Sequence, residues 1–595
     1  MNKYRHLLLF GAIAISFALG FSYLYQIKDN PFFHTPQKEM DMYTYHNYAV
    51  GIVEGRGWPE IIHYSPLYPF VFLPMVYLLF GVNPVAVYII QIIMGALCIF
   101  ITYLIARRFF GTTVAIVSAY MHCLYGVFVV YYGVLLAEVL LNLLVLLSIY
   151  VFLIALDNKN LKYQILCGLL FGLSALAKPT ILAFIPFLII PLFVKRGINK
   201  KAVTDFLLIV LFSGFTILPV TIRNYRLTGG FFPVSSGGPI VFLMGNVPDT
   251  TGVYFYTPQV NKAMEETEGM SLVERNRFYN NKTIGFIKED IPRSLGIFWK
   301  KFLIFWGGWH VSNNVRYYPS YYSLHRNNVV RPTILDFPLL IPWELLTALG
   351  ITGIFISLGM WRKALVLYLF VFIYSAVIIS CMVLGRFRLP IFPVLAIFSG
   401  VTVRSLVKLF YHRRFLKGVC VTAMAASILF IEYGYAQAVF FPSGIYKKTD
   451  EFVIVRDEKM RITDVEDVNC RTAAYKELVL NLDPAGYSKV WMGYFISIKT
   501  YGYMKLIVNG KVVGTIPVRS SVPGDYGYPF VFMDFPVSFL KRGRNAIVIA
   551  PLDEAEVFFY VDSYAKYGRS WVLNRDNENE KKVRGEFVIR LELQK

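Results

Sequence analysis

Residues 134–156 read VLLAEVLLNLLVLLSIYVFLIAL, a run of 23 residues in which Glu138 carries the one charge. A helix that crosses a bilayer core needs about 20 consecutive apolar residues. This run is therefore predicted to form a transmembrane helix. The carboxylate near its start needs a physical reason, because an ionised group in hydrocarbon costs about 3 kcal/mol.

The composition extends this pattern to most of the chain, since 56% of the 595 residues are hydrophobic and 16% are charged. Soluble globular chains are nearer ~25% charged. These values exclude a purely soluble enzyme, a disordered tail protein and a disulfide scaffold. The net charge of +21 does not indicate nucleic acid binding, because lysines and arginines cluster between apolar runs, as topology signals do.

The predicted fold class is a multi-pass α-helical membrane protein with eleven transmembrane spans. The expected spans are 7–25, 84–106, 112–131, 134–156, 163–177, 180–194, 203–222, 334–359, 364–384, 389–410 and 418–438. With a cytoplasmic amino terminus, the inner loops hold most of the lysines and arginines near the spans, as the positive-inside rule requires. The first span is expected to remain as an anchor, because no small-residue cleavage site follows it.

This topology places three large pieces, 26–83, 223–333 and 440–595, on the extracytoplasmic face. The segment 66–80 is apolar but interrupted by prolines, so it is expected to lie partly in the membrane interface. In the 223–333 loop, Pro258 suits a first helical turn, and Ser271 with Glu274 has capping-box spacing. Pro292 is expected to end that helical pattern.

After Pro442-Ser443-Gly444 the pattern changes to short strands separated by turn residues. The expected strands are 490–498, 505–508, 512–517, 546–550, 557–561 and 586–593, and Asn509-Gly510 is typical of a tight hairpin turn. Strands at such spacing predict a β-sandwich. The expected domains are therefore a transmembrane domain at 1–440, with outer loops 26–83 and 223–333, and an extracytoplasmic β-sandwich at 441–595.

Two carboxylates are expected at the outer face. Asp41 lies in the first outer loop, and Glu138 lies near the outer start of the fourth span. On charge alone, Asp41 is more typical of a solvated loop residue. Glu138 instead indicates a polar cavity, because a carboxylate beside hydrocarbon needs a partner or access to water.

Four cations at the outer face are exceptions to the topology rule: Lys178, Arg223, Arg386 and Arg388. Any single one is typical of a side chain that snorkels to phospholipid headgroups. Four cations that converge with two carboxylates beneath large loops are better explained by a bound anion. Arginine offers a planar fork that matches phosphate oxygens.

These motifs resemble, in their order, the GT-C-fold glycosyltransferases that use lipid-phosphate sugars, a superfamily holding protein O-mannosyltransferases and bacterial aminoarabinose transferases. The resemblance covers residues 1–440 and is fairly specific for the fold, although it does not name the substrate. The Glu39-x-Asp41 spacing is similar to the acidic motif of these enzymes, whereas Lys178 stands where many relatives have arginine. The matching pieces are Asp41 to Trp58, Tyr64 to Pro69, Glu138, Gly168 to Pro179, Arg223 to Tyr225, Gly245-Asn246 and Arg386 to Pro390.

The resemblance implies an inverting transfer of a sugar from a polyprenyl-phosphate donor at the extracytoplasmic face of the plasma (inner) membrane. By that resemblance Asp41 is the catalytic base. Three roles stay open for Glu138: orienting an acceptor, tuning Asp41 or holding an arginine. The implied acceptor is a lipid, a glycan or a protein, and no nucleic acid is involved. The candidate ligands of the donor phosphate are, in falling order, Arg386, Arg388, Lys178 and Arg223.

A divalent metal stays open as a cofactor. Glu39 and Asp41, with an outer-loop histidine (His34, His46 or His63), offer ligands that suit a hard ion. Scattered loop histidines are more often structural, and some relatives of this fold work without metal.

Two further alternatives concern the tail and the class of protein. The tail resembles a galactose-binding-like jelly roll, chiefly through Leu540 to Ile547. Its aromatic residues are either stacking faces for a carbohydrate or core, and the domain either binds the acceptor or caps the active-site cavity. A transporter or flippase of a lipid-linked sugar would also place polar residues among the spans, but near mid-membrane and in paired halves. The tail aromatics in question are Trp491, Tyr494, Tyr526 and Tyr528.

Overall fold

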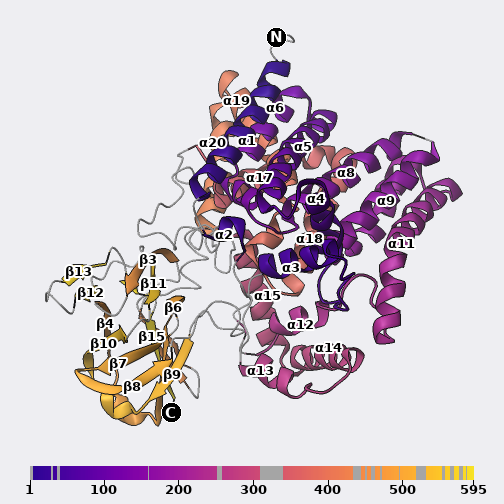
Figure 1. Cartoon of the computed structure of the whole chain (residues 1–595). Coiled ribbons are helices and arrows are strands. Elements are labelled where there is room, and N and C mark those ends of the chain that lie inside the picture. The colour runs from indigo at the N-terminus through magenta and orange to yellow at the C-terminus, as the bar shows by residue number, and fades with distance from the viewer. Residues whose placement is uncertain are drawn as a thin grey trace. The chain divides into compact units, whose positions relative to one another are not determined.

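The computed structural model divides into two compact units (Figure 1). Unit 1 is helical and holds the described residues up to 432, and unit 2 is built of strands and holds those from 444 onward. The predicted fold class, a multi-pass helical membrane protein with a C-terminal β-sheet region, is confirmed. The structure describes residues 5–28, 31–36, 41–158, 160–248, 250, 258–307, 339–432, 444–448, 452–456, 462–468, 472–494, 496–500, 502–517, 531–552, 556–562, 569–574, 580–583, 586–587 and 589–594.

Seven helical stretches in the described residues are long and apolar enough to cross a membrane. The longest, Trp343–Ser380, joins helix α17 (Trp343–Ser357) to α18 (Trp361–Ser380) through the 3₁₀ turn η6 (Leu358–Met360). A second composite stretch, Pro179–Arg196, joins the 3₁₀ turns η3 (Pro179–Ala183) and η4 (Ile185–Leu188) to α10 (Ile189–Arg196). The others correspond to α1 (Arg5–Ile27), α5 (Pro84–Phe110), α8 (Glu138–Asp157), α11 (Lys200–Thr228) and α19 (Phe392–Tyr411).

Every expected span overlaps a helical stretch, but the expected number of eleven crossings is not confirmed. The run 112–131 forms the twelve-residue helix α6 (Thr112–Cys123), the short α7 (Gly126–Val130) and the 3₁₀ turn η2 (Tyr131–Gly133). Twelve residues rise only about 18 Å in an α-helix, which is less than a bilayer core. Two further apolar helices, α9 (Leu161–Ala177) and α20 (Phe415–Phe430), are also shorter than a full span.

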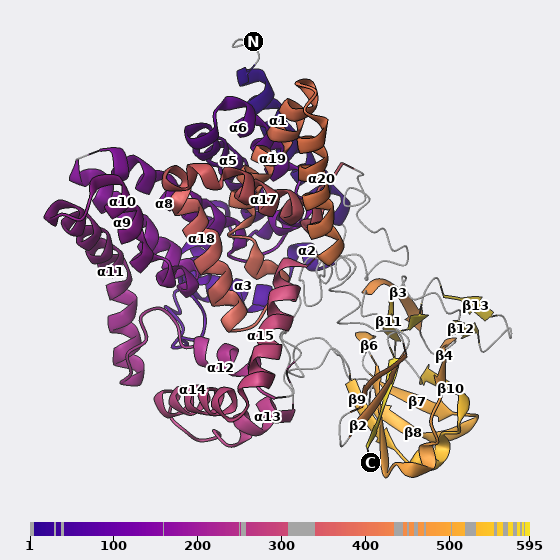
Figure 2. The same cartoon turned by 180° about the vertical axis from the view of Figure 1, so that it is seen from behind.

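The helices of unit 1 pack in two groups that α5 and α8 connect (Figures 1 and 2). One group contains α1, α5, α6, α17, α19 and α20, and the other contains α8, α9, α10, α11 and α18. Small residues allow the closest approaches. A side chain on Gly353 of α17 would lie 1.9 Å from the carbonyl oxygen of Phe398 on α19, and Gly168 of α9 meets the backbone of α11 in the same way. Such contacts bring helix backbones together where lipid supplies no hydrophobic driving force.

The remaining helical elements of unit 1 come from segments 31–80, 238–306 and 385–388. Segment 66–80 forms the π-helix η1 (Leu67–Phe72) and α4 (Leu73–Phe80). The predicted capping box of Ser271 and Glu274 begins α14. Helix α14 ends at Glu289, just before Pro292, as predicted, but Pro292 also occupies the first turn of another helix, α15, which was not predicted. The remaining bounds are α2 (Pro31–His34), α3 (Asp41–Val53), α12 (Gly238–Met244), α13 (Pro258–Glu265), α14 (Leu272–Glu289), α15 (Ile291–Trp306) and the 3₁₀ turn η7 (Gly385–Arg388).

Unit 2 contains three antiparallel sheets, whose strand orders are β1-β2-β15-β5-β9, β13-β12-β4-β10-β7-β8 and β14-β11-β3, with β6 paired to β11. Apolar side chains from all three sheets meet in one core. The strands are β1 (Gly444–Lys448), β2 (Phe452–Arg456), β3 (Ile462–Val468), β4 (Thr472–Leu480), β5 (Lys489–Tyr494), β6 (Ile496–Thr500), β7 (Tyr503–Val508), β8 (Lys511–Pro517), β9 (Val531–Phe535), β10 (Gly543–Pro551), β11 (Glu556–Asp562), β12 (Ser570–Asn574), β13 (Glu580–Lys582), β14 (Glu586–Phe587) and β15 (Ile589–Gln594).

Two asparagines organise the β7–β8 hairpin and its neighbour β10. Asn509 and Gly510 have φ of 50° and 77°, which is the left-handed conformation of the predicted tight turn. The Asn509 side chain donates to Asn545 Oδ1 (2.9 Å), and Asn545 in turn donates to the carbonyl oxygens of Lys541 and Gly543. The Leu540 to Ile547 motif therefore stabilises a turn.

The tail aromatics considered as stacking faces have different environments. Tyr494 is buried in the sheet core, so the structure contradicts its use as a stacking face. Lys489 Nζ lies 4.2 Å from the ring centroid of Trp491. Tyr526 and Tyr528 lie outside the described residues.

Candidate active site

Asp41 and Arg386 are in direct contact although 345 positions separate them. Arg386 Nη2 donates to Asp41 Oδ2 at 2.9 Å. Asp41 begins α3, where the positive end of the helix dipole favours a carboxylate. Arg386 belongs to the 3₁₀ turn η7 between α18 and α19. The side chains are 31% and 17% exposed, so the pair is partly accessible from outside.

Glu138 is the second carboxylate beside this guanidinium. Its Oε1 lies 3.9 Å from Arg386 Nε, and its side chain is 8% exposed. Its Oε2 is buried and has no hydrogen-bond partner among the described residues. One arginine thus lies between a carboxylate that begins α3 and a carboxylate that begins α8.

A buried glutamine holds the turn that precedes Glu138. Gln91 of α5 donates to the carbonyl oxygens of Tyr131, Tyr132 and Val134 at 2.9–3.2 Å. Its own carbonyl oxygen accepts a hydrogen bond from Tyr68 of η1 at 2.8 Å. The break in the helix leaves these backbone oxygens without helical partners, and the Gln91 amide supplies the hydrogen bonds instead. These bonds fix the turn that leads into α8.

Lys178 lies close enough to these charges to respond to them. It occupies the junction between α9 and η3, with its Nζ 3.7 Å from the ring centroid of Phe387. Burial lowers the pKa of the Lys178 ammonium to about 7; Glu138 and Asp41 oppose this shift, and Arg386 adds to it. Lys178 is therefore a cation whose charge depends on its neighbours.

Tyr45 and His63 are two further neighbours of Asp41. Tyr45 lies one helical turn after Asp41 on α3, and its pKa is raised well above the usual value, mainly by burial and next by Asp41. Burial lowers the pKa of His63, and Asp41 opposes that shift. The i, i+4 spacing from Asp41 is the signal that identifies Tyr45 in the sequence. His63 carries no comparable signal.

Arg388 is placed differently from Arg386, although the two are neighbours in η7. It is 2% exposed and donates to the carbonyl oxygens of Ile304 (2.5 Å) and Gly307 (3.0 Å) at the carboxyl end of α15. Its guanidinium carbon lies 5.1 Å from the ring centroid of Trp343. Arg388 thus binds the last carbonyl groups of a helix, as cationic side chains often do. The sequence had instead predicted a contact with the donor phosphate.

Arg223 contacts the loop that follows α3. It lies within α11, which continues to Thr228 and is longer than the expected span. Its Nη2 donates to the carbonyl oxygen of Pro59, and its guanidinium carbon lies 5.6 Å from the ring centroid of Trp58. The described contacts of Arg223 thus hold the loop that follows α3.

A buried lysine that sequence reasoning missed fixes the chain just before Arg386. Lys301 of α15 is fully buried and donates to Asn246 Oδ1 (2.9 Å), Ser380 O (3.1 Å) and Cys381 O (2.9 Å). A side chain on Gly245 would lie 1.7 Å from Cys381 O, so only glycine fits there. The Gly245-Asn246 motif therefore supports the segment that leads to Arg386.

Among the described residues that were considered for a metal, no cluster is assembled. Glu39 lies outside the described residues. His46 Nδ1 is 2.7 Å from the hydroxyl of Tyr77. The described part of the chain contains no group of three or more histidine, cysteine, aspartate or glutamate residues that could hold a metal ion.

Residues 64–222 match the family model of dolichyl-phosphate-mannose-protein mannosyltransferases. The matched segment includes Glu138, Lys178 and the helices α5, α8 and α9. The match confirms the predicted resemblance to lipid-phosphate-sugar glycosyltransferases over that segment. No curated protein sequence matches the chain.

Solved structures similar to this chain include three glycosyltransferases. The Archaeoglobus fulgidus oligosaccharyltransferase in its apo form has 17% identity and a TM-score of 0.41, over 72% of this chain and 55% of its own. ArnT from Cupriavidus metallidurans bound to undecaprenyl phosphate has 13% identity and a TM-score of 0.29, over 67% and 78%. The arabinosyltransferase EmbB from Mycobacterium smegmatis has 11% identity and a TM-score of 0.26, over 100% and 64%. The chain thus spans about half the length of the archaeal enzyme.

Proposed function

We propose that this chain is an integral membrane glycosyltransferase that transfers a sugar from a polyprenyl-phosphate donor to an acceptor. The observation that supports this most directly is the position of Arg386, 2.9 Å from Asp41 and 3.9 Å from Glu138. A carboxylate base that accepts a proton and a cation that binds a phosphate are the two groups that such a transfer needs. The family match over residues 64–222 supports the same class of donor.

In the proposed inverting step, Asp41 accepts the proton of an acceptor hydroxyl or amine while that group attacks the anomeric carbon of the sugar. The bond from the anomeric carbon to the phosphate oxygen breaks on the opposite face, and polyprenyl phosphate leaves with the electron pair. Asp41 keeps one oxygen for Arg386 and offers the other to the acceptor, because a carboxylate accepts through both oxygens. General-base help of this kind contributes roughly 10²- to 10⁴-fold.

The departing phosphate gains negative charge during this step, so a fixed cation stabilises the transition state more than the ground state. A guanidinium has five N–H donors, enough to hold Asp41 and a phosphate together. Arg386 is therefore the first candidate for the phosphate ligand. Lys178, whose Nζ lies against Phe387 of the same turn, is the second.

The other two cations receive positioning roles in this proposal. Arg388 holds turn η7 against the end of α15, and Arg223 holds the first outer loop through Pro59. Of the three roles left open for Glu138, holding an arginine has the support of its 3.9 Å distance to Arg386. We also propose that the site faces the extracytoplasmic side of the plasma (inner) membrane, because most lysines and arginines of the connecting loops lie in the loops assigned to the opposite side.

The test is mass spectrometry of cell-envelope glycans and polyprenyl-phosphate lipids from cells with the gene, without it, and with Asp41→Asn. We expect both altered strains to lose one glycan modification and to accumulate the lipid-linked sugar. Normal glycans in the Asp41→Asn strain, with the protein at its usual level, would contradict the proposed base. A flippase would instead be indicated if purified protein moved the lipid-linked sugar between leaflets and transferred no sugar.

A further inference from the structure

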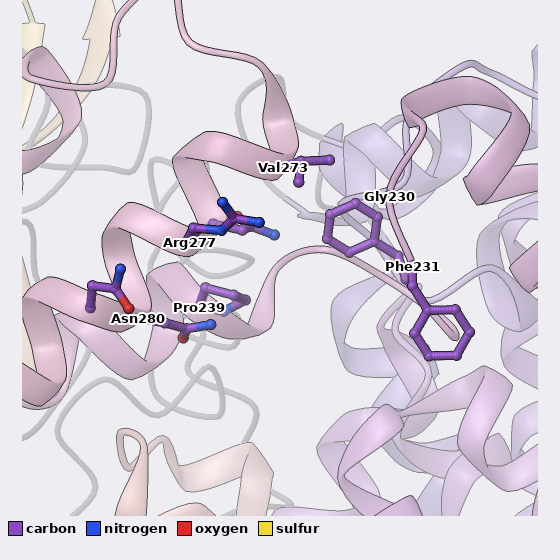
Figure 3. Close-up of a pocket in the computed structure, with 9 residues that line it drawn as sticks. Gly230, Phe231, Pro239, Val273, Arg277 and Asn280 are labelled. Carbon is purple, nitrogen blue, oxygen red and sulfur yellow. The ribbon is translucent and has the colours of Figure 1, made fainter.

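A pocket of about 440 Å³ lies in unit 1 between the end of α11 and helix α14 (Figure 3). One wall is the segment that carries Gly230, Phe231 and Phe232. The other wall is one face of α14, because the lining residues 273, 276, 277, 280 and 281 recur at intervals of three or four positions along the helix. In Figure 3 the side chain of Arg277 extends from α14 toward the segment of Gly230 and Phe231.

The lining is rich in amides and poor in charge. Asn276, Asn280 and Asn281 each carry an NH₂ group and a carbonyl oxygen, and Arg277 is the one charged residue among the described residues that line the pocket. Phe231 is 76% exposed and offers an apolar face at the rim. Paired donors and acceptors beside an aromatic ring suit a ligand with several hydroxyl groups. A phosphate ligand would be expected to meet more than one cation.

Hydrogen bonds connect this pocket to the loop beside Asp41. Asn276 donates to the carbonyl oxygen of Ser236 (3.0 Å), and the Ser236 amide donates to the carbonyl oxygen of Ile62 (2.8 Å). The next residue, His63, packs so closely on Gly237 that an added Cβ would lie 3.1 Å from its ring. His63 also responds to the charge of Asp41 through its pKa, which Asp41 raises against the larger effect of burial. The pocket is therefore connected, through Ser236 and Gly237, to the loop that carries Ile62 and His63 beside Asp41.

We propose that the pocket bounded by Phe231, Asn280 and Arg277 binds a saccharide ring. The further statement that this saccharide belongs to the acceptor rests on the proposed transferase function. A hydroxyl-rich acceptor held here would be oriented by the same backbone that carries Ile62 and His63.

The test is saturation-transfer NMR on the full chain in detergent micelles, with methyl glycosides of common hexoses and pentoses as probes and glycerol phosphate as a probe for lipid headgroups. We expect at least one glycoside to receive saturation from the wild-type protein. Arg277→Ala and Asn280→Ala should raise its Kd about tenfold, since each removes hydrogen-bonding groups from an exposed part of the lining. The matched control is Lys288→Ala, an exposed cation on the same helix outside the pocket, which should leave the Kd unchanged.

Absence of saturation transfer to every glycoside would overturn the proposal, and so would an unchanged Kd in both lining variants. Binding of glycerol phosphate alone, lost in Arg277→Ala, would make the pocket a headgroup site and would also overturn it. Sugar transfer by the Asp41→Asn protein separates the two proposals. If this variant transfers sugar normally, the proposed base is wrong. Glycoside binding to the pocket would then still support a saccharide site, but not its assignment to the acceptor.

Discussion

The guanidinium of Arg386 lies between two carboxylates, so its removal has two consequences. Asp41 and Glu138 would lose the positive charge between them, which is costly for a group as buried as Glu138. A bound phosphate would also lose its fork of N–H donors. Lysine keeps the charge but not the fork, so a comparison of the two substitutions separates electrostatics from geometry.

We expect Arg386→Ala to raise the Kd for a polyprenyl-phosphate sugar by roughly 10- to 100-fold, because a charge-assisted hydrogen bond contributes about 1.5–3 kcal/mol. Arg386→Lys should cost less. Microscale thermophoresis in lipid nanodiscs measures both values. Arg226→Ala, an exposed cation near the end of α11, is the matched control. Wild-type donor affinity in Arg386→Ala would remove this residue from the phosphate site.

If Lys178 binds the donor phosphate, donor binding should depend on pH. The Lys178 pKa of about 7 means that the ammonium is charged below that pH and loses its charge as the pH rises through it. A phosphodiester donor keeps its negative charge throughout, so donor affinity should fall between about pH 6 and pH 8. Lys178→Arg should remove this dependence, because arginine stays protonated. If the wild type and Lys178→Arg gave the same pH profile, Lys178 would not be a phosphate ligand.

Sequence reasoning identified the acidic and basic residues at the site but not their individual roles. Glu138 and Arg386 carry their own signal, since charged groups beside apolar spans need partners. Asp41 does not, because on charge alone it is typical of a solvated loop residue, and only the family resemblance indicated its role. Arg386 and Arg388 are indistinguishable in the sequence, being two positions apart in one motif. Packing separates them: Arg388 reaches the end of α15, and Arg386 reaches the carboxylates.

Helix α15 supports the segment that carries Arg386 through contacts in its carboxyl-terminal half. Near its carboxyl end, the carbonyl oxygens of Ile304 and Gly307 receive Arg388, and within it Lys301 binds the carbonyl oxygens of Ser380 and Cys381. The segment between residues 380 and 388, which includes Arg386, is therefore held at both ends by one helix.

Lys301→Met should destabilise the protein by roughly 2–5 kcal/mol, because it leaves buried acceptors without donors. It should also weaken donor binding, since the segment before Arg386 loses its anchor. Thermal unfolding in detergent and donor titration measure the two effects. Lys288→Met, which replaces an exposed lysine on α14, should change neither. A stable Lys301→Met protein with full donor affinity would show that α15 does not position the turn.

The elements that the sequence predicted well have local signals, and those it missed do not. The capping box of Ser271 and the Asn509-Gly510 turn need only neighbouring residues to form. Helix α15 was missed because a proline after a helical run was interpreted as its end, whereas proline is equally suited to the first turn of the next helix. The turn between η2 and α8 depends on Gln91, which comes from a different helix.

Across the entire chain, composition and hydropathy were sufficient to predict a helical membrane unit followed by a β-sheet unit. They were not sufficient to count crossings, because apolar runs also occur in helices shorter than a bilayer, such as α6 and α9. The contact between residues 41 and 386 is a property of the folded unit: segments from near its start and near its end meet at one pair of atoms.

The proposed mechanism is tested most directly by single-turnover sugar transfer from a polyprenyl-phosphate donor by purified Asp41→Asn protein, with donor affinity measured in the same preparation. We predict a transfer rate roughly 10²- to 10⁴-fold below wild type, with the donor still bound, because the amide cannot accept the acceptor's proton. Glu54→Gln, which neutralises an exposed carboxylate directly after α3, should transfer at the wild-type rate. Transfer by Asp41→Asn at the wild-type rate would contradict the assignment of Asp41 as the base.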